Sequence, residues 1–514
     1  MNEDLLTATR PRHPARTSLA DVVAWLRGID PQLSTRGDLD DSVVTGISLS
    51  SRRILPGDLY AALPGAQVHG IEYAADAVAA GAVAVVTDPA GADLAGDRTL
   101  GVPVVVVADP RALLGRLAAR LHGEPATALR MIGVTGTQGK TTTTRLAEGG
   151  LLDAGVPAAV IGTVGTRVDG HDIKTSLTTP EAPDLHGLFA MMRERDVVAC
   201  AMEVSSHALV KGRVDGVVFD VAVFLNLGRD HLDFHADLDD YFAAKASLFT
   251  PERARLGLVN VDDEHGRRLL DLGGIPLRTF SGSGAEADWR AVDVEAGPAG
   301  STFTVEGPGG LRFPAGVPLP GDFNVANALA AVAACGEAGF DAALVADGIR
   351  RGGGVPGRLE LVDAGQDFVV VVDYAHKPDA VEAILHTLRP LATGRLLVVL
   401  GAGGDRDPGK RPIMGEIAGR LAGLLVVTDD NPRTEDPAAI RAAVLAGTGS
   451  ATAEVLEIGD RRAAIEEAVR RARPGDIVLL AGKGHETGQE VAGVVHPFDD
   501  RAVAREALES RGTP

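Results

Sequence analysis

Short apolar runs that alternate with helical stretches constrain the fold of this chain most. Between residues 131 and 260 the runs MIGVT, AAVIGT, VVACAMEV, VVFDVAVF and LGLVN have the length of buried strands. The same alternation continues after Gly357 with FVVVVD, RLLVVLG, GLLVVT and DIVLLAG. Such alternation is typical of mostly parallel sheets that helices cover on both faces, and ligands bind such sheets beyond the carboxyl ends of the strands.

The chain has 514 residues, too many for one hydrophobic core, and we expect three α/β domains. The first, residues 1–109, alternates strand-like runs such as DLYAAL and AVAVVTD with Ala-rich helical stretches. Asp109-Pro110 opens the amphipathic segment ALLGRLAARL and marks a boundary. The second and third domains are predicted at residues 110–355 and 356–514.

Composition excludes several classes of protein. The 70 acidic and 50 basic residues give a net charge of −20, which opposes non-specific binding to nucleic acid. Cys200 and Cys335 lie in apolar surroundings and are expected to be reduced thiols. The sequence has no signal-peptide pattern and no apolar run near the ~20 residues of a membrane helix. We expect a cytoplasmic protein with no nucleic-acid or membrane partner.

The strongest local signal is GVTGTQGKTTTT, residues 133–144, between a strand and a helical segment. There backbone N–H groups and the helix N-terminus can face phosphates, Lys140 can reach the terminal phosphates, and Thr141 can hold Mg²⁺. The usual pattern G-x-x-x-x-G-K-[ST] has glycine at the position of Val134, so only the physical context is met. A purely structural turn is the alternative.

Polar residues follow two further strands. Glu203 and His207 end one strand, and Asp230, His231, Asp233 and His235 end another. Carboxylate and imidazole at neighbouring strand ends predict an Mg²⁺ or Mn²⁺ shell, although each cluster alone is typical of a solvated loop.

Later segments offer weaker signals. From residue type and position alone, Lys245 in DYFAAKASLF is expected to be an exposed helix lysine. Asn324 and Asn327 have helical spacing and suit either capping or an adenine edge. Asp373 and His376 follow an apolar strand. The turns GGDRDPGKRP, DDNPRTEDP and AGKGHETGQE follow three strands and could line one pocket, but turn chemistry also explains them.

In this order the segments resemble the Mur ligase family across residues 45 to 500. The motifs that carry the resemblance are GVTGTQGKTTTT, TTPE, MEVSSHAL, RDHLDFH, DYFAAKASLF, GDFNVANALAA, GVPGRLE, VDYAHKP, DNPRTE and GKGHE. The resemblance implies an N-terminal uridine-binding domain, a central P-loop ATPase and a C-terminal Rossmann-like domain that binds the amino acid.

It also implies a reaction: diaminopimelate is joined to the D-glutamate γ-carboxylate of a UDP-linked muramoyl dipeptide in peptidoglycan synthesis, through an acyl phosphate. ATP is a substrate and Mg²⁺ a cofactor, and a monomer is expected. The rivals are another ligase of this superfamily, such as a folylpolyglutamate synthase, and a nucleotide-switched binding protein. The DNPR form goes with diaminopimelate, whose distal carboxylate an arginine can grip bidentately. Whether the meso or the LL isomer is used stays open.

Residue roles carry over from the matching motifs. ATP binding is implied for Gly136, Thr137, Gln138, Gly139, Lys140, Thr141, Thr142, Asn324, Asn327, Arg358 and Asp373. UDP-muramoyl-dipeptide binding is implied for Ser51, Thr178, Thr179, Ser205, Lys211 and Arg213. Diaminopimelate binding is implied for Arg406, Asp430, Asn431, Pro432, Arg433, Gly482 and Glu486.

The implied catalytic residues are Lys140, Lys245, Glu203 and His231, and the implied metal ligands are Thr141, Glu203, His231 and Lys245. Lys245 matches the family's carbamylated lysine, in which CO₂ converts the amine to an anion that supports Mg²⁺. The chain departs from the family pattern at Ser50, Gln138, Lys211 and Gly228, which bears on substrate affinity.

Overall fold

The computed structural model describes residues 7–39, 41–96, 100–173, 175 and 177–511. The chain forms two compact units. The first comprises Met1–Ser281, Ala285–Trp289 and Ala330–Val345, and the second comprises Gly282–Gly284, Arg290–Leu329 and Ala346–Pro514. Within the described residues, no helix combines the length and apolar character that crossing a bilayer needs.

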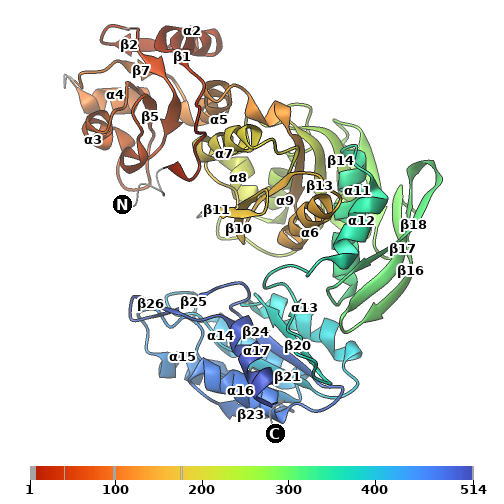
Figure 1. Ribbon diagram of the computed structural model, residues 1–514. Helices are drawn as coiled ribbons and strands as arrows, with labels where there is room; N and C mark the ends of the chain where they lie inside the picture. The colour runs from red at the N-terminus through yellow and green to blue at the C-terminus, as the bar shows by residue number, and fades with distance from the viewer. Residues whose placement is uncertain (1–6, 40, 97–99, 174, 176, 512–514) are drawn as a thin grey trace. The chain divides into compact units, whose positions relative to one another are not determined.

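The N-terminal domain is built on a five-stranded sheet with the order β2-β7-β6-β5-β4, parallel except for β2. Alternate residues of β5 enter two cores: Leu59 and Ala61 join one, and Tyr60 and Ala62 join the other. Helices α2 and α5 cover the first face, and α3 and α4 cover the second (Figure 1). The bounds are α2 Leu19–Ile29, β2 Ser34–Arg36, β4 Gly46–Ser48, β5 Asp58–Ala62, α3 Ala74–Ala79, β6 Ala84–Thr87, α4 Pro89–Ala95, β7 Val104–Val106 and α5 Pro110–Leu121.

The central domain contains a run of six parallel strands in the order β9-β12-β8-β13-β14-β15. Helix α6 follows β8 directly, and α9 precedes β14. The short strands β10 and β11 extend one edge in antiparallel fashion. The bounds are β8 Arg130–Thr135, α6 Lys140–Asp153, β9 Ala158–Gly162, β10 Gly165–Val168, β11 His171–Ile173, α7 Ala182–Glu194, β12 Ala199–Glu203, α8 Ser206–Val210, β13 Phe219–Phe224, α9 Leu238–Ala246, β14 Ala254–Asn260, α10 Glu264–Leu272 and β15 Leu277–Ser281.

Three antiparallel strands follow, β16 (Trp289–Gly297), β17 (Gly300–Gly307) and β18 (Leu311–Val317). The strand-helix alternation did not predict them. The available sequence signal was the alternation of Phe303 and Val305 with Thr302 and Thr304. In the structure Ser301, Phe303 and Val305 of β17 are buried. Helices α11 (Asp322–Glu337) and α12 (Ala342–Arg351) come next.

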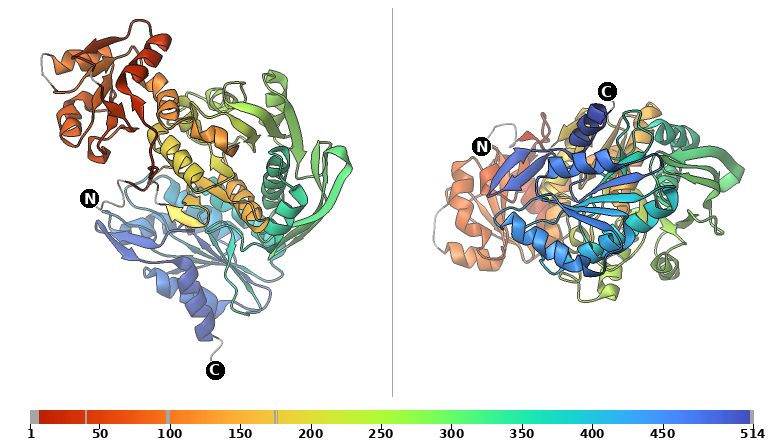
Figure 2. Two further views of the ribbon diagram at one scale, coloured as in Figure 1. Left: turned by 45° about the horizontal axis from the view of Figure 1, so that its top comes forward. Right: turned by 90° about the horizontal axis from the view of Figure 1, so that it is seen from below.

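The C-terminal domain has a six-stranded sheet, β19-β20-β24-β21-β22-β23, parallel except for β19. Alternate strand residues such as Val398 and Val399 enter opposite cores. Helices α13, α14 and α15 pack on one face and α16 and α17 on the other (Figure 2). The bounds are β19 Glu360–Leu361, β20 Val369–Asp373, α13 Pro378–Leu388, β21 Leu396–Leu400, α14 Lys410–Leu421, β22 Leu424–Val427, α15 Pro437–Leu445, β23 Glu454–Glu457, α16 Arg461–Arg471, β24 Ile477–Ala481, β25 Gly488–Val491, β26 Val494–Pro497 and α17 Asp500–Arg511. The predicted α/β fold with mostly parallel sheets is confirmed.

A buried ion pair joins the starts of α16 and α17. Arg461 donates from Nε and Nη2 to the two carboxylate oxygens of Asp500 at 2.7 and 2.6 Å, and both side chains are fully buried. Nη2 of Arg461 also donates to the carbonyl of Ala481 at the end of β24.

Asp500→Ala should therefore destabilise this domain by about 3–5 kcal/mol, because it leaves the Arg461 charge buried without its partner. Urea unfolding measures the loss. The control is Glu506→Ala on the same helix, because the ion pair of Glu506 with Arg462 is exposed to solvent. The stability of this control variant should stay close to that of the unchanged protein. Equal stability of the two variants would contradict the importance of the buried pair.

Candidate active site

The glycine-rich loop runs from the end of β8 to the start of α6. Gly139 has φ +85°, a conformation that favours glycine, and it turns the chain into the helix at Lys140. Asn226, just after β13, holds the loop: its Oδ1 accepts the N–H groups of Thr137 and Gln138 at 3.1 and 2.9 Å. Sequence reasoning did not select Asn226; its position just past a strand end was the available signal.

Two lysines meet at one carbonyl of this loop. Nζ of Lys140 and Nζ of Lys245 donate to the oxygen of Gly136 at 2.8 and 2.9 Å. Lys245 is only 1% exposed, so the expectation of an exposed helix lysine was wrong. Burial, with the charge of Lys140 adding to it, holds the pKa of Lys245 well below its usual range. Residue type and position alone could not reveal this burial, because α9 packs Lys245 against a loop more than 100 positions away in the chain; only the family resemblance pointed to a special role.

Glu203 lies at the carboxyl end of β12, beside the start of α6. Its Oε1 accepts the hydroxyl of Thr141 and the N–H of Thr163, both at 2.8 Å, and its Oε2 accepts the Thr163 hydroxyl at 3.1 Å. A Cβ on Gly162 would come within 2.2 Å of Oε1, so the glycine leaves room for the carboxylate. The structure thus brings together Thr141 and Glu203, two of the predicted metal ligands.

His231 lies in a group of rings past β13. Its ring contacts His207 edge-on, with centroids 4.8 Å apart, and His207 stacks on Phe234 at 4.0 Å. In the part of the chain that the structure describes, no three His, Cys, Asp or Glu side chains are grouped as a ready metal site. Any cation would therefore also need other donors, such as hydroxyls, water, phosphate or a modified lysine.

Residues predicted to bind the muramoyl dipeptide gather around the same strand end. The Thr179 hydroxyl donates to the Glu203 carbonyl at 2.8 Å and accepts the N–H of Ser205 at 3.2 Å. Arg213 donates to the carbonyl of Thr179 and to Glu181. The Thr178 hydroxyl lies 3.0 Å from that of Thr163.

Lys211 and Ser51 were also predicted to bind the UDP-muramoyl dipeptide. Nζ of Lys211 lies 5.9 Å from the centre of the Phe234 ring. Ser51 begins a short 3₁₀ helix, Ser51–Arg53, in the N-terminal domain.

The other predicted nucleotide residues lie in the second unit. Asn324 donates to the Pro320 carbonyl at 2.8 Å and accepts from Nδ2 of Asn327 at 3.2 Å, and both amides are buried. The guanidinium of Arg358 lies over the Tyr374 ring. Asp373 accepts the N–H groups of Leu359 and Ala375, and burial raises its pKa. Nδ1 of His376 lies 2.8 Å from the Tyr374 carbonyl.

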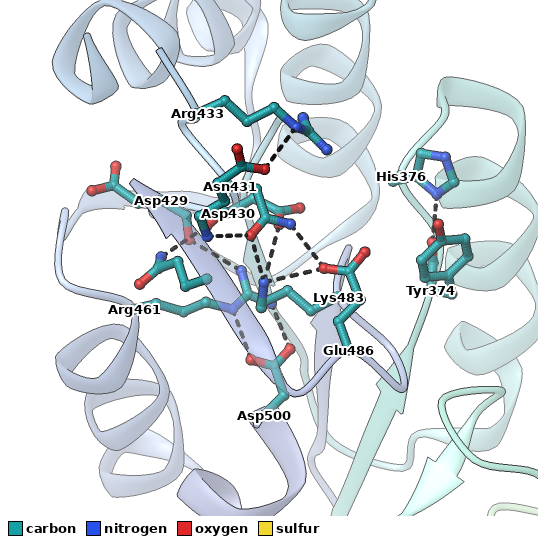
Figure 3. Close-up of polar contacts among 12 residues, drawn as sticks. Tyr374, His376, Asp429, Asp430, Asn431, Arg433, Arg461, Lys483, Glu486 and Asp500 are labelled. Atoms are coloured by element: carbon teal, nitrogen blue, oxygen red, sulfur yellow. Dashed lines mark hydrogen bonds and ion pairs between the residues drawn. The ribbon is translucent and has the colours of Figure 1, made fainter. Parts of the chain in front are cut away.

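The C-terminal domain gathers the predicted amino-acid residues at the ends of β22 and β24 (Figure 3). Nδ2 of Asn431 donates to Oε2 of Glu486 at 2.8 Å. Asp430 is buried, and a Cβ on Gly482 would come within 2.7 Å of its carboxylate. Pro432 is buried between Asn431 and Arg433.

Arg433 and Arg406 approach the same glycine. A Cβ on Gly403 would lie 3.0 Å from Nη1 of Arg433 and 3.9 Å from Cγ of Arg406. Arg433 donates to the Gly404 carbonyl at 2.6 Å, and its Nε lies 3.5 Å from Glu490. Arg406 is exposed. Arg433 and Arg406 therefore both lie near Gly403, whose surroundings also include the backbone carbonyl of Asn431.

Comparisons with known proteins agree with this architecture. Family models match residues 43–122 (Mur ligase family, catalytic domain), 134–335 (Mur ligase middle domain) and 357–484 (Mur ligase, glutamate ligase domain). The chain therefore belongs to the Mur ligase family, and it is an ATP-dependent amide ligase.

A UDP-N-acetylmuramoyl-L-alanyl-D-glutamate–2,6-diaminopimelate ligase from Streptomyces avermitilis is 55% identical over 97% of this chain and 98% of its own length. A relative from Leifsonia xyli, a UDP-N-acetylmuramyl-tripeptide synthetase, is 47% identical over 98% of both chains. A solved structure of a UDP-N-acetylmuramoyl-L-alanyl-D-glutamate–2,6-diaminopimelate ligase is 34% identical to this chain. The two structures match with a TM-score of 0.69 over 97% of this chain and 100% of the solved chain.

Lys140→Ala should reduce ATP-driven turnover at least about 100-fold, because the family resemblance implies that Lys140 is the cation that faces the transferring phosphoryl group. The melting temperature should change little, since the Lys140 side chain is partly exposed and donates to the carbonyls of Gly136 and Thr137 in its own loop. ADP release and a thermal melt measure the two effects. Normal turnover in this variant would show that the loop is only a structural turn.

Proposed function

We propose that the protein joins diaminopimelate to the γ-carboxylate of D-glutamate in UDP-N-acetylmuramoyl-L-alanyl-D-glutamate, at the expense of ATP. The observation that carries this proposal is the group formed by Arg433, Arg406, Asn431 and Glu486 in the C-terminal domain. The names of the most similar relatives support the same substrates.

Diaminopimelate suits this group because it carries two amino-acid ends. Its distal carboxylate fits the guanidinium of Arg433, with Arg406 nearby, and its distal ammonium fits Glu486. L-Lysine has the distal amine but no distal carboxylate. The arginines therefore distinguish the two amino acids, whereas the choice between the meso and LL isomers depends on finer geometry.

The chemistry begins with activation of a carboxylate, which is a poor electrophile. The γ-phosphoryl group of ATP passes to the D-glutamate γ-carboxylate and gives an acyl phosphate and ADP. The neutral amine of diaminopimelate attacks the acyl carbon, phosphate leaves, and the amine loses a proton as the amide forms. In this scheme the backbone N–H groups of the glycine-rich loop cradle the phosphates, and Lys140 offsets their negative charge. His376, just past β20, is a candidate for orienting the attacking amine.

Thr141, Glu203, His231 and a modified Lys245 would hold Mg²⁺. These residues suit Mg²⁺, because the Thr141 hydroxyl and the Glu203 carboxylate lie 2.8 Å apart and both can supply oxygen ligands to a cation. When bound, the cation neutralises phosphate charge. The low pKa of Lys245 supplies a neutral amine; this amine attacks CO₂, releases a proton and leaves a carbamate anion.

The remaining substrate contacts are part of the same proposal. Asn324, Asn327, Arg358 and Asp373 bind the nucleotide. Thr178, Thr179, Ser205, Lys211 and Arg213 bind the muramoyl dipeptide, and Ser51 binds its uridine. The cytoplasmic location, the monomeric state and the domain ranges 1–109, 110–355 and 356–514 also stay predictions.

Two rival functions make different predictions. A folylpolyglutamate synthase from Mycobacterium tuberculosis shares the fold, with a TM-score of 0.57 at 18% identity, which carries no substrate information. A nucleotide-switched binding protein would hydrolyse ATP regardless of acceptor. ADP release measured with and without the muramoyl dipeptide and a panel of amino acids separates these possibilities.

Diaminopimelate should be used about 30-fold to several thousand-fold better than L-lysine, judged by kcat/KM. The reason is that L-lysine offers Arg433 no distal carboxylate and leaves it only Glu490, and losing a hydrogen-bonded charge pair with the substrate costs about 2–5 kcal/mol. Steady-state kinetics with both amino acids test this. Similar kcat/KM values would refute the assignment of Arg433 and Arg406 to the distal carboxylate.

Lys245→Ala should lose most activity, and acetate or formate should restore part of it by occupying the vacated anion site. Lys245→Arg should resist rescue, because its guanidinium puts positive charge where the cation needs a ligand. Lys377→Ala, which removes an exposed lysine, is the control and should stay active. Turnover near that of the unchanged enzyme in Lys245→Ala would disprove the carbamate, as would an unmodified Lys245 in electron density from crystals grown with bicarbonate.

A further inference from the structure

A second buried lysine, Lys483, lies in the loop after β24, and the proposed mechanism gives it no role. Its side chain is fully buried. Nζ donates to Oδ1 of Asn431 at 3.0 Å and to Oε2 of Glu486 at 3.2 Å, and it lies 3.7 Å from Oδ1 of Asp430 (Figure 3). Each of these three partners belongs to the group proposed to bind the amino acid.

The ammonium fixes which way the Asn431 amide faces. A lysine ammonium only donates hydrogen bonds, so it must meet the oxygen of the amide and not its nitrogen. The backbone N–H of Glu490 donates to the same oxygen at 2.9 Å. Nδ2 of Asn431 is therefore turned toward Glu486, where it donates to Oε2.

The same contacts orient Glu486. The hydrogen bonds from Lys483 and Asn431 both end on Oε2. Oε1 is left to receive an ammonium from the incoming amino acid. Without Lys483, two changes would follow: the amide could flip, and Glu486 would lose one of the two donors that hold its carboxylate.

Charge reinforces this geometry. Lys483 lies between the carboxylates of Asp430 and Glu486, so one buried cation separates two anions. The nearby Arg461 cannot substitute for it, because Asp500 engages that guanidinium bidentately. Loss of Lys483 would leave the two carboxylates to repel each other in a poorly solvated place.

The hairpin β25–β26 ties this pair to Arg433. Arg433 has φ +54° and forms a bridge with Val491; its N–H donates to the Glu490 carbonyl at 3.0 Å. Nε2 of Gln489 donates to the Asp430 carbonyl at 2.7 Å. Since Glu490 also donates to Asn431, a shift of Asn431 would be transmitted to the backbone of Arg433.

We propose that Lys483 is a positioning residue for the amino-acid site: its buried ammonium sets the orientation of Asn431 and Glu486, so that these side chains meet the distal end of diaminopimelate. The inference rests on the proposed function for the identity of the amino acid. It assigns Lys483 no contact with the reacting atoms.

Lys483→Met, which keeps a similar volume without the charge, is the main test. The KM for diaminopimelate should rise about 30-fold or more, because a partner of buried charged groups is lost. kcat should change little, and so should the KM values for ATP and the muramoyl dipeptide. Arg462→Met, which removes an exposed cation from the same domain, should leave all of these constants unchanged.

A merely structural role gives a different pattern. The melting temperature would fall and kcat would decline with the active fraction, while the KM for diaminopimelate stayed the same. That outcome would overturn the proposal. Lys483→Gln provides a milder variant that keeps hydrogen-bond donors without the charge, and its KM should lie between those of the unchanged enzyme and Lys483→Met.

A second measurement does not depend on the substrate. Hydrogen exchange of the Asn431 side-chain amide, assigned by NMR with the help of Asn431→Ser, should be slow in the unchanged protein and fast in Lys483→Met. Exchange as fast as that of a surface amide in the unchanged protein would overturn the proposal even if neither Lys483 variant folds. If the unchanged enzyme ignores diaminopimelate, the proposed function fails, and the exchange data still decide the role of Lys483.

Discussion

Helices cover both faces of the C-terminal sheet, and this burial confines polar chemistry to the ends of its strands. Residues such as Val398 and Val399 point into opposite cores, so neither face can carry a charged side chain at low cost. The loops after the carboxyl ends are the places where backbone N–H groups and charged side chains can meet a ligand. Glu203 occupies the matching position in the central domain, directly at the end of β12.

Two buried lysines, Lys245 and Lys483, show two ways in which the protein accommodates a basic side chain away from water. Lys245 donates to the Gly136 carbonyl, and burial together with the nearby charge of Lys140 lowers its pKa, which favours the neutral amine. Lys483 instead lies between Asp430 and Glu486, whose negative charges stabilise its ammonium. The same residue type therefore has a lowered pKa in one domain and lies between two carboxylates in another.

Three of the four departures from the family pattern have local explanations. Gly228 donates its backbone N–H to the Thr137 hydroxyl at 2.9 Å, a contact that needs no side chain. Gln138 is held through its backbone by Asn226. Ser50 exchanges two hydrogen bonds with the hydroxyl of Ser48. These residues keep their loops in place through the backbone, which tolerates a change of side chain.

The sequence by itself determined the α/β class, the strands that precede each loop and the motifs that mark the family, because hydrophobic periodicity and glycine placement are local properties. It did not determine the burial of Lys245, the role of Asn226 or the position of Lys483, and it missed strands β16 to β18. Those features depend on which distant segments pack together: Asn226 lies 88 residues from Gln138, and Lys483 lies 52 residues from Asn431. Only the tertiary structure decides such contacts, because the charge state and orientation of a side chain follow from the groups that enclose it.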